Sequence, residues 1–244
     1  MVDTAYRTEY LGKNISAVVS DEHTFGTDAV LLARFASAKQ KDVCCDLGTG
    51  CGIIPLLLLR EEFKECLTAV EIQENACRQV EEAIKINHLK GKLQVINCDL
   101  REYEKNLPMG KFSLVTFNPP YFSKESGQAS PNESVRIARH EIMSDVFEGA
   151  KCASYILKFG GRFCVCHRPE RLCDVFQAMR ENNIEPKRMT FCSRKKGMKP
   201  FLVLVEGKKG GKCGLKVEEE IILADENGQY LDGIYGDYEV KNNG

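Results

Sequence analysis

The sequence predicts an α/β fold: a doubly wound, mainly parallel sheet of seven strands that ends in an antiparallel hairpin. Two observations predict it: short apolar runs alternate with helical patterns, and a short basic connection separates the last two runs. The runs begin at Val43, Leu67, Leu93, Phe112, Phe163, Met189 and Phe201. With 244 residues and 43% hydrophobic composition, the chain can bury a sizeable core, and a single domain over 1–244 is expected.

One helical pattern, at 29–38, precedes the first strand, and the others lie between the strands, at 53–59, 75–87, 100–105, 144–157 and 172–182. Residues 1–24 are expected to form an N-terminal extension. Residues 123–137 begin with a stretch rich in Ser, Gly, Asn and Pro without periodicity, which predicts a flexible loop over a cleft or an ordinary disordered connection. Residues 186–216 are expected to form a basic hairpin region.

The first strand runs directly into a glycine-rich turn. Its spacing is Gly-x-Gly-x-Gly at Gly48, Gly50 and Gly52, whereas the dinucleotide fingerprint is Gly-x-Gly-x-x-Gly. Asp46 stands two positions before the first glycine, where a carboxylate is a poor neighbour for a pyrophosphate but a good one for cationic groups. S-adenosylmethionine carries a sulfonium and an ammonium and no phosphate, so the charge favours it over NAD.

Acidic residues follow the next two strands. Glu71 lies at the end of the second strand, where a carboxylate can accept both hydroxyls of a ribose, or is a solvated charge at a helix start. Asp99 follows the third strand and either reads an adenine amino group or caps the helix from Leu100. Earlier, Thr27 or Asp28 is expected to be an ordinary helix N-cap.

Asn118, Pro119, Pro120 and Tyr121 directly follow the fourth strand, at the edge of an open α/β sheet where ligands bind. The two prolines stiffen this loop. The Asn118 amide oxygen and the Pro119 carbonyl are acceptors, and Tyr121 offers a ring for stacking. Such a site suits a planar amino group, either the exocyclic amine of adenine or the amide of glutamine. The alternative is a plain turn followed by a buried tyrosine.

Together these motifs resemble the class I S-adenosylmethionine-dependent methyltransferases that modify planar nitrogens, which have a Rossmann-like fold. Within them the chain looks most like the bacterial tRNA(Val) adenosine-N6 methyltransferase family. The segments that carry this closer likeness are Ala138–Glu141, Gly160–Phe163, His167–Leu172 and Glu185–Arg188.

The resemblance implies S-adenosylmethionine as cofactor and tRNA as partner, with methyl transfer to N6 of an anticodon-loop adenosine. It also implies roles by position. The methionine part of the cofactor would be lined by Asp46, Gly48, Gly50 and Gly52, the ribose by Glu71, the adenine by Asp99 and Leu100, and the carboxylate end would be approached by Thr27. The catalytic loop would be Asn118, Pro119, Pro120 and Tyr121, with Asn118 also facing the cofactor.

The charges of the whole chain nearly cancel, with 34 basic and 35 acidic residues, but residues 186–216 hold ten Lys and Arg against Glu206 alone. This stripe predicts phosphate contacts, or else it is a solvated, lysine-protected hairpin edge. The candidate RNA contacts are Arg139, Arg194, Lys195, Lys196 and Lys199.

Other classes are disfavoured. No apolar stretch is long enough to span a membrane and the start lacks a signal-like segment, so a cytoplasmic protein is expected. The 12 cysteines are expected to be free thiols, and the absence of Cys-x-x-Cys with only four scattered histidines argues against zinc.

Two alternatives to the RNA enzyme remain. One is a protein-glutamine N5 methyltransferase, although only some 24 residues precede Phe25 where such enzymes carry a helical domain. The other is an RNA-binding methyltransferase fold without activity.

Overall fold

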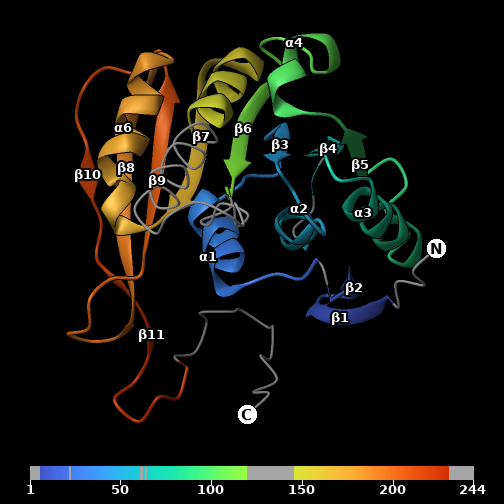
Figure 1. The fold of residues 1–244 in the computed structure, drawn as a ribbon, viewed down its shortest axis with the longest axis horizontal. Helices are drawn as coiled ribbons and strands as arrows, with labels where there is room; N and C mark the ends of the chain where they lie inside the picture. Colours follow the sequence, from blue (N-terminus) through green and yellow to red (C-terminus); the bar gives the residue numbers. More distant parts are fainter. Residues whose placement is uncertain (1–5, 22, 61–62, 64, 120–145, 231–244) are drawn as a thin grey trace, which may run out of the picture.

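The computed structural model describes residues 6–21, 23–60, 63, 65–119 and 146–230 (Figure 1). Its centre is a nine-stranded sheet in the order β10-β8-β9-β7-β6-β3-β4-β5, with β11 also paired to β8. The strands are β3 (Cys44–Leu47), β4 (Leu67–Glu71), β5 (Leu93–Asn97), β6 (Phe112–Phe117), β7 (Leu157–His167), β8 (Ile184–Lys195), β9 (Leu202–Lys209), β10 (Lys216–Val217) and β11 (Ile221–Ala224).

The seven predicted strands correspond in order to β3 through β9. Strand β9 is antiparallel to both β7 and β8, and the other described pairings of this sheet are parallel, so the predicted fold class is confirmed. Strand β7 begins at Leu157, ahead of the predicted Phe163, because the chain continues through two glycines with a shift in its register against β6. The sheet also extends past the predicted seven strands, since β10 and β11 add to the outer edge of β8.

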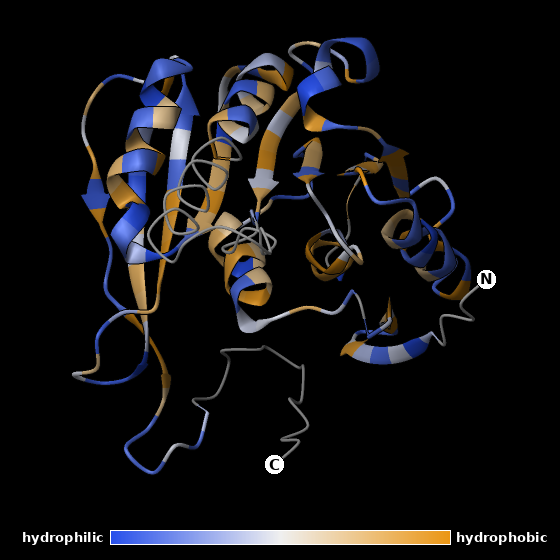
Figure 2. Ribbon diagram, viewed as in Figure 1, coloured by the Kyte–Doolittle hydropathy of each residue, from blue (hydrophilic) through white to orange (hydrophobic). Residues whose placement is uncertain are grey.

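Helices cover both faces of the sheet. One face is covered by α1 (Thr27–Ala36), α2 (Ile53–Leu58) and α3 (Glu74–Ile86); the other by η1 (Leu100–Glu102), α4 (Tyr103–Asn106), a helix over 146–156, η2 (Pro169–Arg171) and α6 (Leu172–Glu181). Neighbouring strand residues point to opposite faces, so Leu114 packs in the first apolar cluster and Val115 in the second. In Figure 2, α2 is hydrophobic along its length, whereas α3 and α6 show alternating bands because one side of each faces water.

The predicted N-terminal extension contains a β-hairpin. Strands β1 (Arg7–Gly12) and β2 (Ile15–Val19) are joined at Lys13 and Asn14, whose φ angles of 49° and 60° suit a two-residue hairpin turn. Asn87, just after α3, fixes the hairpin: its Nδ2 donates to the Ser16 carbonyl at 2.7 Å and its Oδ1 accepts from the Ser16 N–H at 2.8 Å. These contacts span 71 positions of sequence, so no local pattern indicated them.

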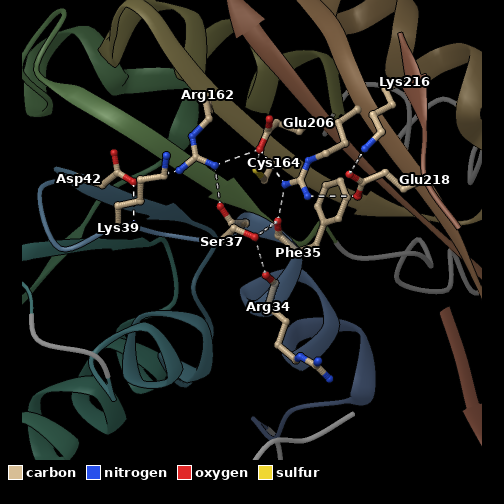
Figure 3. Close-up of polar contacts among 12 residues, drawn as sticks. Arg34, Phe35, Ser37, Lys39, Asp42, Arg162, Cys164, Glu206, Lys216 and Glu218 are labelled. Atoms are coloured by element: carbon tan, nitrogen blue, oxygen red, sulfur yellow. Dashed lines mark hydrogen bonds and ion pairs between the residues drawn. The ribbon is translucent and has the colours of Figure 1, made fainter. Parts of the chain in front are cut away.

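An arginine cluster, made of Arg162, Arg188, Glu206, Asp42 and Glu218, fastens the end of α1 to the sheet. Figure 3 labels four of its members, Arg162, Glu206, Asp42 and Glu218. Arg162 donates to the Ala36 carbonyl at 2.7 Å, to Asp42 at 2.9 Å and to Glu206 at 3.0 Å. Arg188 donates to the Phe35 carbonyl at 2.6 Å, to Glu206 at 3.0 Å and to Glu218 at 3.2 Å. The cluster therefore satisfies carbonyls at the negative end of the α1 dipole with two cations.

All 12 cysteines lie in described residues and are free, and nine of them are buried. Burial raises the pKa of Cys44, Cys51, Cys152 and Cys192 to about 12, so these groups remain neutral thiols. Among the described residues, no helix is long and apolar enough to cross a membrane. The same residues contain no group of three or more His, Cys, Asp or Glu side chains arranged to hold a metal ion.

Candidate active site

A cavity of about 670 Å³ opens at the carboxyl ends of β3, β4 and β6, the edge where open α/β sheets bind ligands. Its walls come from segments that are far apart in sequence. They are Thr24–Gly26 with Asp28 and Ala29, the glycine turn Gly48–Cys51 with Ile53, Val70–Gln73, Cys98–Arg101, and Phe117, Asn118 and Glu148.

The glycine turn has the backbone that only glycine adopts readily. Gly48, Gly50 and Gly52 have φ angles of 58°, 56° and 80°. A Cβ at Gly50 would meet nothing within 4 Å, which places this residue on the open side of the turn. A Cβ at Gly52 would lie 3.0 Å from Val80 on α3, so Gly52 packs against a helix and is not among the lining residues.

Asp46 lies beneath the glycine turn and is not among the residues that line the cavity. It is 3% exposed, and its two oxygens accept hydrogen bonds from the hydroxyls of Thr49 and Thr116, both at 2.6 Å. Burial raises the pKa of Asp46 to about 7, although the two hydroxyls act to lower it. Its observed contacts join β3 to the turn and to β6, and direct contact with the cofactor stays a prediction.

Glu71 lines the cavity at the end of β4. It is 5% exposed, so the alternative of a solvated charge at a helix start is wrong. One oxygen accepts from the Gly50 N–H at 2.9 Å, and the other accepts from the Gln73 N–H at 2.9 Å. Each carboxylate oxygen still has a lone pair for a ligand hydroxyl, so the predicted ribose role is compatible with these bonds.

Asp99 and Leu100 also line the cavity. The Asp99 side chain caps η1 by accepting the Arg101 N–H at 2.9 Å, and it pairs with the Arg101 guanidinium, whose Nε lies 3.0 Å away. Hydrogen bonds from Arg101 lower the pKa of Asp99, so the group is ionised. The capping alternative is therefore observed, and reading of an adenine amino group remains a prediction.

Asn118 emerges from β6 with both ends of its amide engaged. Its Nδ2 donates to Asp28 Oδ2 at 3.1 Å, and its Oδ1 accepts from the Cys166 thiol at 2.9 Å. Pro119 is buried beside it. Pro120, Tyr121, Arg139 and the predicted loop 123–137 lie outside the described residues.

The start of α1 differs from the prediction. Neither Thr27 nor Asp28 is the N-cap: Gly26 occupies that position, and glycine has no side chain that could make a cap hydrogen bond. Thr27 is the first helical residue and is not among the lining residues, whereas Gly26 and Asp28 are. Asp28 contacts Asn118, and this tertiary contact replaces the local capping bond that its residue type favours.

The cavity is acidic. Its lining holds the carboxylates of Asp28, Glu71, Asp99 and Glu148, and among the described lining residues the cation is Arg101, already paired with Asp99. Such a surface favours a cationic ligand and disfavours a phosphate. Sequence reasoning missed Glu148, because its helix follows the segment 120–145 and nothing local marks it as a neighbour of the first strands.

Phe117 forms part of the wall between the glycine turn and the helix over 146–156. A Cβ at Gly48 would lie 3.5 Å from its ring, and a Cβ at Gly149 would lie 2.2 Å from its Cε1. Two glycines thus flank this ring, and the second of them has no room for any side chain. Phe117 immediately precedes Asn118, so its packing sets where the predicted catalytic loop begins.

Strand directions divide the predicted basic stripe into two groups. Strands β8 and β9 are antiparallel and β9 is antiparallel to β7, so β8 ends at the same sheet edge as β6, towards which the β6 arrow points in Figure 1. The group at this edge comprises Arg194, Lys195, Lys196 and Lys199, and we call it the edge cations. The group at the opposite edge comprises Lys187, Lys208, Lys209, Lys212 and Lys216, while Arg188 belongs to the arginine cluster.

Comparisons with known proteins identify the family and agree with the fold. The family model described as methyltransferase small domain matches residues 13–161. A tRNA1(Val) (adenine(37)-N6)-methyltransferase of Histophilus somni is 26% identical over 213 residues, covering 84% of both chains. A relative of the same name from Parabacteroides distasonis is 28% identical over 183 residues, covering 74% of this chain and 75% of the relative. A solved structure from Agrobacterium tumefaciens, described as a predicted O-methyltransferase, has a TM-score of 0.68 at 19% identity and covers 84% of this chain and 92% of its own.

Proposed function

This chain belongs to the methyltransferase small domain family, and we propose that it methylates the exocyclic N6 of an adenosine in tRNA. The coarser activity, methyl transfer from S-adenosylmethionine, follows from the family. The finer assignment is supported by relatives named for adenine(37)-N6 methylation of a valine tRNA, at 26% and 28% identity. We propose an anticodon-loop adenosine of that tRNA as the substrate.

The described residues fit S-adenosylmethionine. The donor supplies an electrophilic methyl carbon on a sulfonium, and four lining carboxylates suit its positive charges better than they would suit a phosphate. Gly48 and Gly50 would hold the methionine part through their backbone, Glu71 the ribose, and Asp99 with Leu100 the adenine. Asp46 and Gly52 would support this wall from behind.

Asn118 and Pro119 would bind the substrate nitrogen. The Asn118 amide oxygen and the Pro119 carbonyl can each accept one N–H of the amine, which favours the pyramidal nitrogen needed for attack. The lone pair of an aromatic amine is delocalised, so orientation is the main requirement, and good alignment contributes up to ~7–11 kcal/mol in intramolecular reactions. A strong base is not required, because the proton becomes acidic once the nitrogen carries the methyl group.

One observation carries the proposal: Asn118, at the carboxyl end of β6, borders a cavity with glycine and carboxylate walls. The edge cations favour RNA over protein as the substrate, since four positive side chains at this sheet edge suit a phosphate backbone. Protein-glutamine N5 methylation uses the same acceptors and is the second enzyme candidate. A silent RNA-binding fold is the third.

The test is to incubate the protein with S-adenosylmethionine labelled in its methyl group and with separate pools of tRNA, rRNA, DNA and protein. We expect label in tRNA, released as N6-methyladenosine on nuclease digestion. Label in protein glutamine would replace the proposal with the second candidate. Binding of tRNA without transfer to any pool would favour the silent fold.

A further inference from the structure

The reaction proposed above uses only one end of the Asn118 amide. The oxygen and nitrogen ends of a side-chain amide have nearly the same shape, but only the oxygen can accept an N–H from a substrate amine. A turned amide would present two N–H groups to an amine that also carries N–H groups. The site therefore needs neighbours that fix the amide orientation.

Asp28 and Cys166 contact opposite ends of this amide and have opposite hydrogen-bonding character. An ionised carboxylate can only accept, and Asp28 Oδ2 takes a hydrogen bond from Asn118 Nδ2 at 3.1 Å. A thiol can donate and is only a weak acceptor, and the Cys166 thiol donates to Asn118 Oδ1, with Sγ and Oδ1 2.9 Å apart. Turning the amide would place its oxygen against the carboxylate and its N–H groups against the thiol.

Asp28 is the stronger of these two partners. A hydrogen bond to an ionised group is about twice as strong as a neutral one, whereas a thiol is a weak donor. An amide oxygen has two lone pairs, so the Cys166 contact occupies only one of the two acceptor sites of Asn118 Oδ1. The two side chains that meet at 3.1 Å come from positions 90 residues apart, and both line the cavity.

The backbone before α1 makes room for this carboxylate. A Cβ at Gly26 would lie 2.5 Å from Asp28 Oδ1, so a larger residue there would push the carboxylate from its place. Asp28 is not the N-cap of the helix, since Gly26 occupies that position and Asp28 is the second helical residue. Its placement towards Asn118 is therefore not a by-product of helix capping.

We propose that Asp28 is a positioning residue that holds the Asn118 amide with its oxygen available to the substrate amine. This inference rests on the proposed function, because it assumes that Asn118 accepts an N–H of the substrate. Asp28 acts through Asn118 and need not touch the reacting atoms. Any planar amine substrate, in RNA or in protein, would need the same orientation.

The test compares Asp28→Ala and Asp28→Asn with the wild-type chain, using saturating tRNA and methyl donor. We expect Asp28→Ala to lower kcat on the order of 10- to 100-fold, the scale of a misplaced catalytic group, with a small change in donor affinity. Asp28→Asn can still accept through its amide oxygen, so it should recover part of kcat. Glu74→Ala is the matched control, because Glu74 is the first-turn acid of α3 and is not among the lining residues.

A second variant guards against loss of folding. Gly26→Ala keeps the carboxylate but displaces it, and it should lower kcat in the same way. The side-chain amide resonances of Asn118 in a ¹⁵N NMR spectrum, assigned with Asn118→Ala, should shift in both Asp28→Ala and Gly26→Ala. Wild-type kcat in Asp28→Ala, or a loss confined to donor affinity, would overturn the inference. If the wild-type enzyme transferred label to protein and not to tRNA, the proposed substrate would be wrong instead. The kcat of Asp28→Ala would then be compared with that of the wild type on the labelled protein.

Discussion

Thr116 Oγ1 on β6 donates a hydrogen bond to Asp46 Oδ1 on β3 over 2.6 Å, directly beneath the glycine turn. Thr49 Oγ1 donates to the other oxygen of the same carboxyl at 2.6 Å. Two hydroxyls thus replace the water that an aspartate normally binds. They do not cancel the effect of burial, which raises the pKa of Asp46 from 3.8 to about 7.

The raised pKa predicts a pH dependence of stability. Between 3.8 and about 7 the folded chain keeps a proton on Asp46 that the unfolded chain has released. The contribution of this group is therefore fully present below the lower value and is lost as the pH rises through the upper one. As the pH rises over this range, the loss of this contribution lowers the free energy of unfolding by roughly 4 kcal/mol.

Asp46→Asn should remove this dependence, because asparagine has no charge to bury and can still bond to both hydroxyls. His167 has the opposite effect in the wild type. Burial lowers its pKa from 6.5 to about 4, so its contribution raises the free energy of unfolding as the pH rises over that range. His167 is present in both proteins, so its contribution cancels when the free energy of unfolding of the wild type is subtracted from that of the variant at each pH, both measured in urea. We expect the variant to gain stability relative to wild type as the pH rises, and parallel profiles would contradict this.

The edge cations give a second prediction. Replacing Lys195, Lys196 and Lys199 with glutamine should weaken tRNA binding and lower the slope of log affinity against log salt by about 2, since each lost phosphate contact removes ~0.7–0.9. The measurement is filter binding over a salt series.

Lys208, Lys212 and Lys216 provide a control of equal charge at the opposite sheet edge, and all three are exposed. Their replacement with glutamine should leave the slope nearly unchanged. Equal effects of the two triple variants would mean that net charge, not position, governs binding.

Asn118→Ala gives a third prediction. It should abolish detectable methyl transfer, because it removes an acceptor for the substrate amine, while leaving donor binding largely intact. Calorimetry with S-adenosylmethionine and the labelled tRNA assay separate these two effects. Asn106→Ala removes an amide on α4 outside the cavity lining and should behave as wild type. Near wild-type turnover in Asn118→Ala would refute its assigned role.

The strands and the glycine turn were predictable because their signals are local. An apolar run marks each strand, and Gly48, Gly50 and Gly52 adopt positive φ angles within five residues of one another. Strand β10 was not predictable, since its two residues carry no pattern of their own and are held by pairing with β8. Strand β11 is a short apolar run, Ile221–Ala224, which the prediction of seven strands missed.

The site was predictable only in part, for the same reason. Each acidic residue at the end of a strand could be identified from its position, and the capping bond of Asp99 was one of its predicted roles because its partner lies two residues away. The distant partners of Asp46 and Glu71 could not be identified. Asp28 satisfies the local rule for an N-cap, yet it contacts Asn118, which the chain brings near only after folding. The division of the basic stripe also depends on strand direction, which a count of charges cannot reveal.

Gly149→Ala gives a fourth prediction. Alanine usually stabilises a helix by about 1 kcal/mol relative to glycine. Here its Cβ would lie 2.2 Å from the Phe117 ring, and overpacking costs about 1–3 kcal/mol, so the net effect should be a loss of stability. Because Phe117 also packs on Gly48, donor affinity should fall as well. Adding Phe117→Leu makes room, and a double-mutant cycle by thermal unfolding should recover part of the loss; additive losses would contradict the contact.

Glu206→Gln is the last prediction, and it concerns the arginine cluster. Glu206 accepts hydrogen bonds from Arg162 and Arg188, each at 3.0 Å, and these side chains are 13%, 22% and 21% exposed. Removing the charge leaves two cations facing each other, and breaking a buried pair costs about 3–5 kcal/mol. We expect a loss near the lower end, because Asp42 and Glu218 still pair with the arginines. Glu102→Gln disrupts an exposed pair with Lys105, worth less than about 1 kcal/mol, and is the control.

Since the cluster holds the end of α1, whose first turn carries Asp28, Glu206→Gln should also lower kcat. Urea unfolding and tRNA methylation on the same samples test both effects, and a variant as stable as Glu102→Gln would show that the cluster does not hold α1 in place.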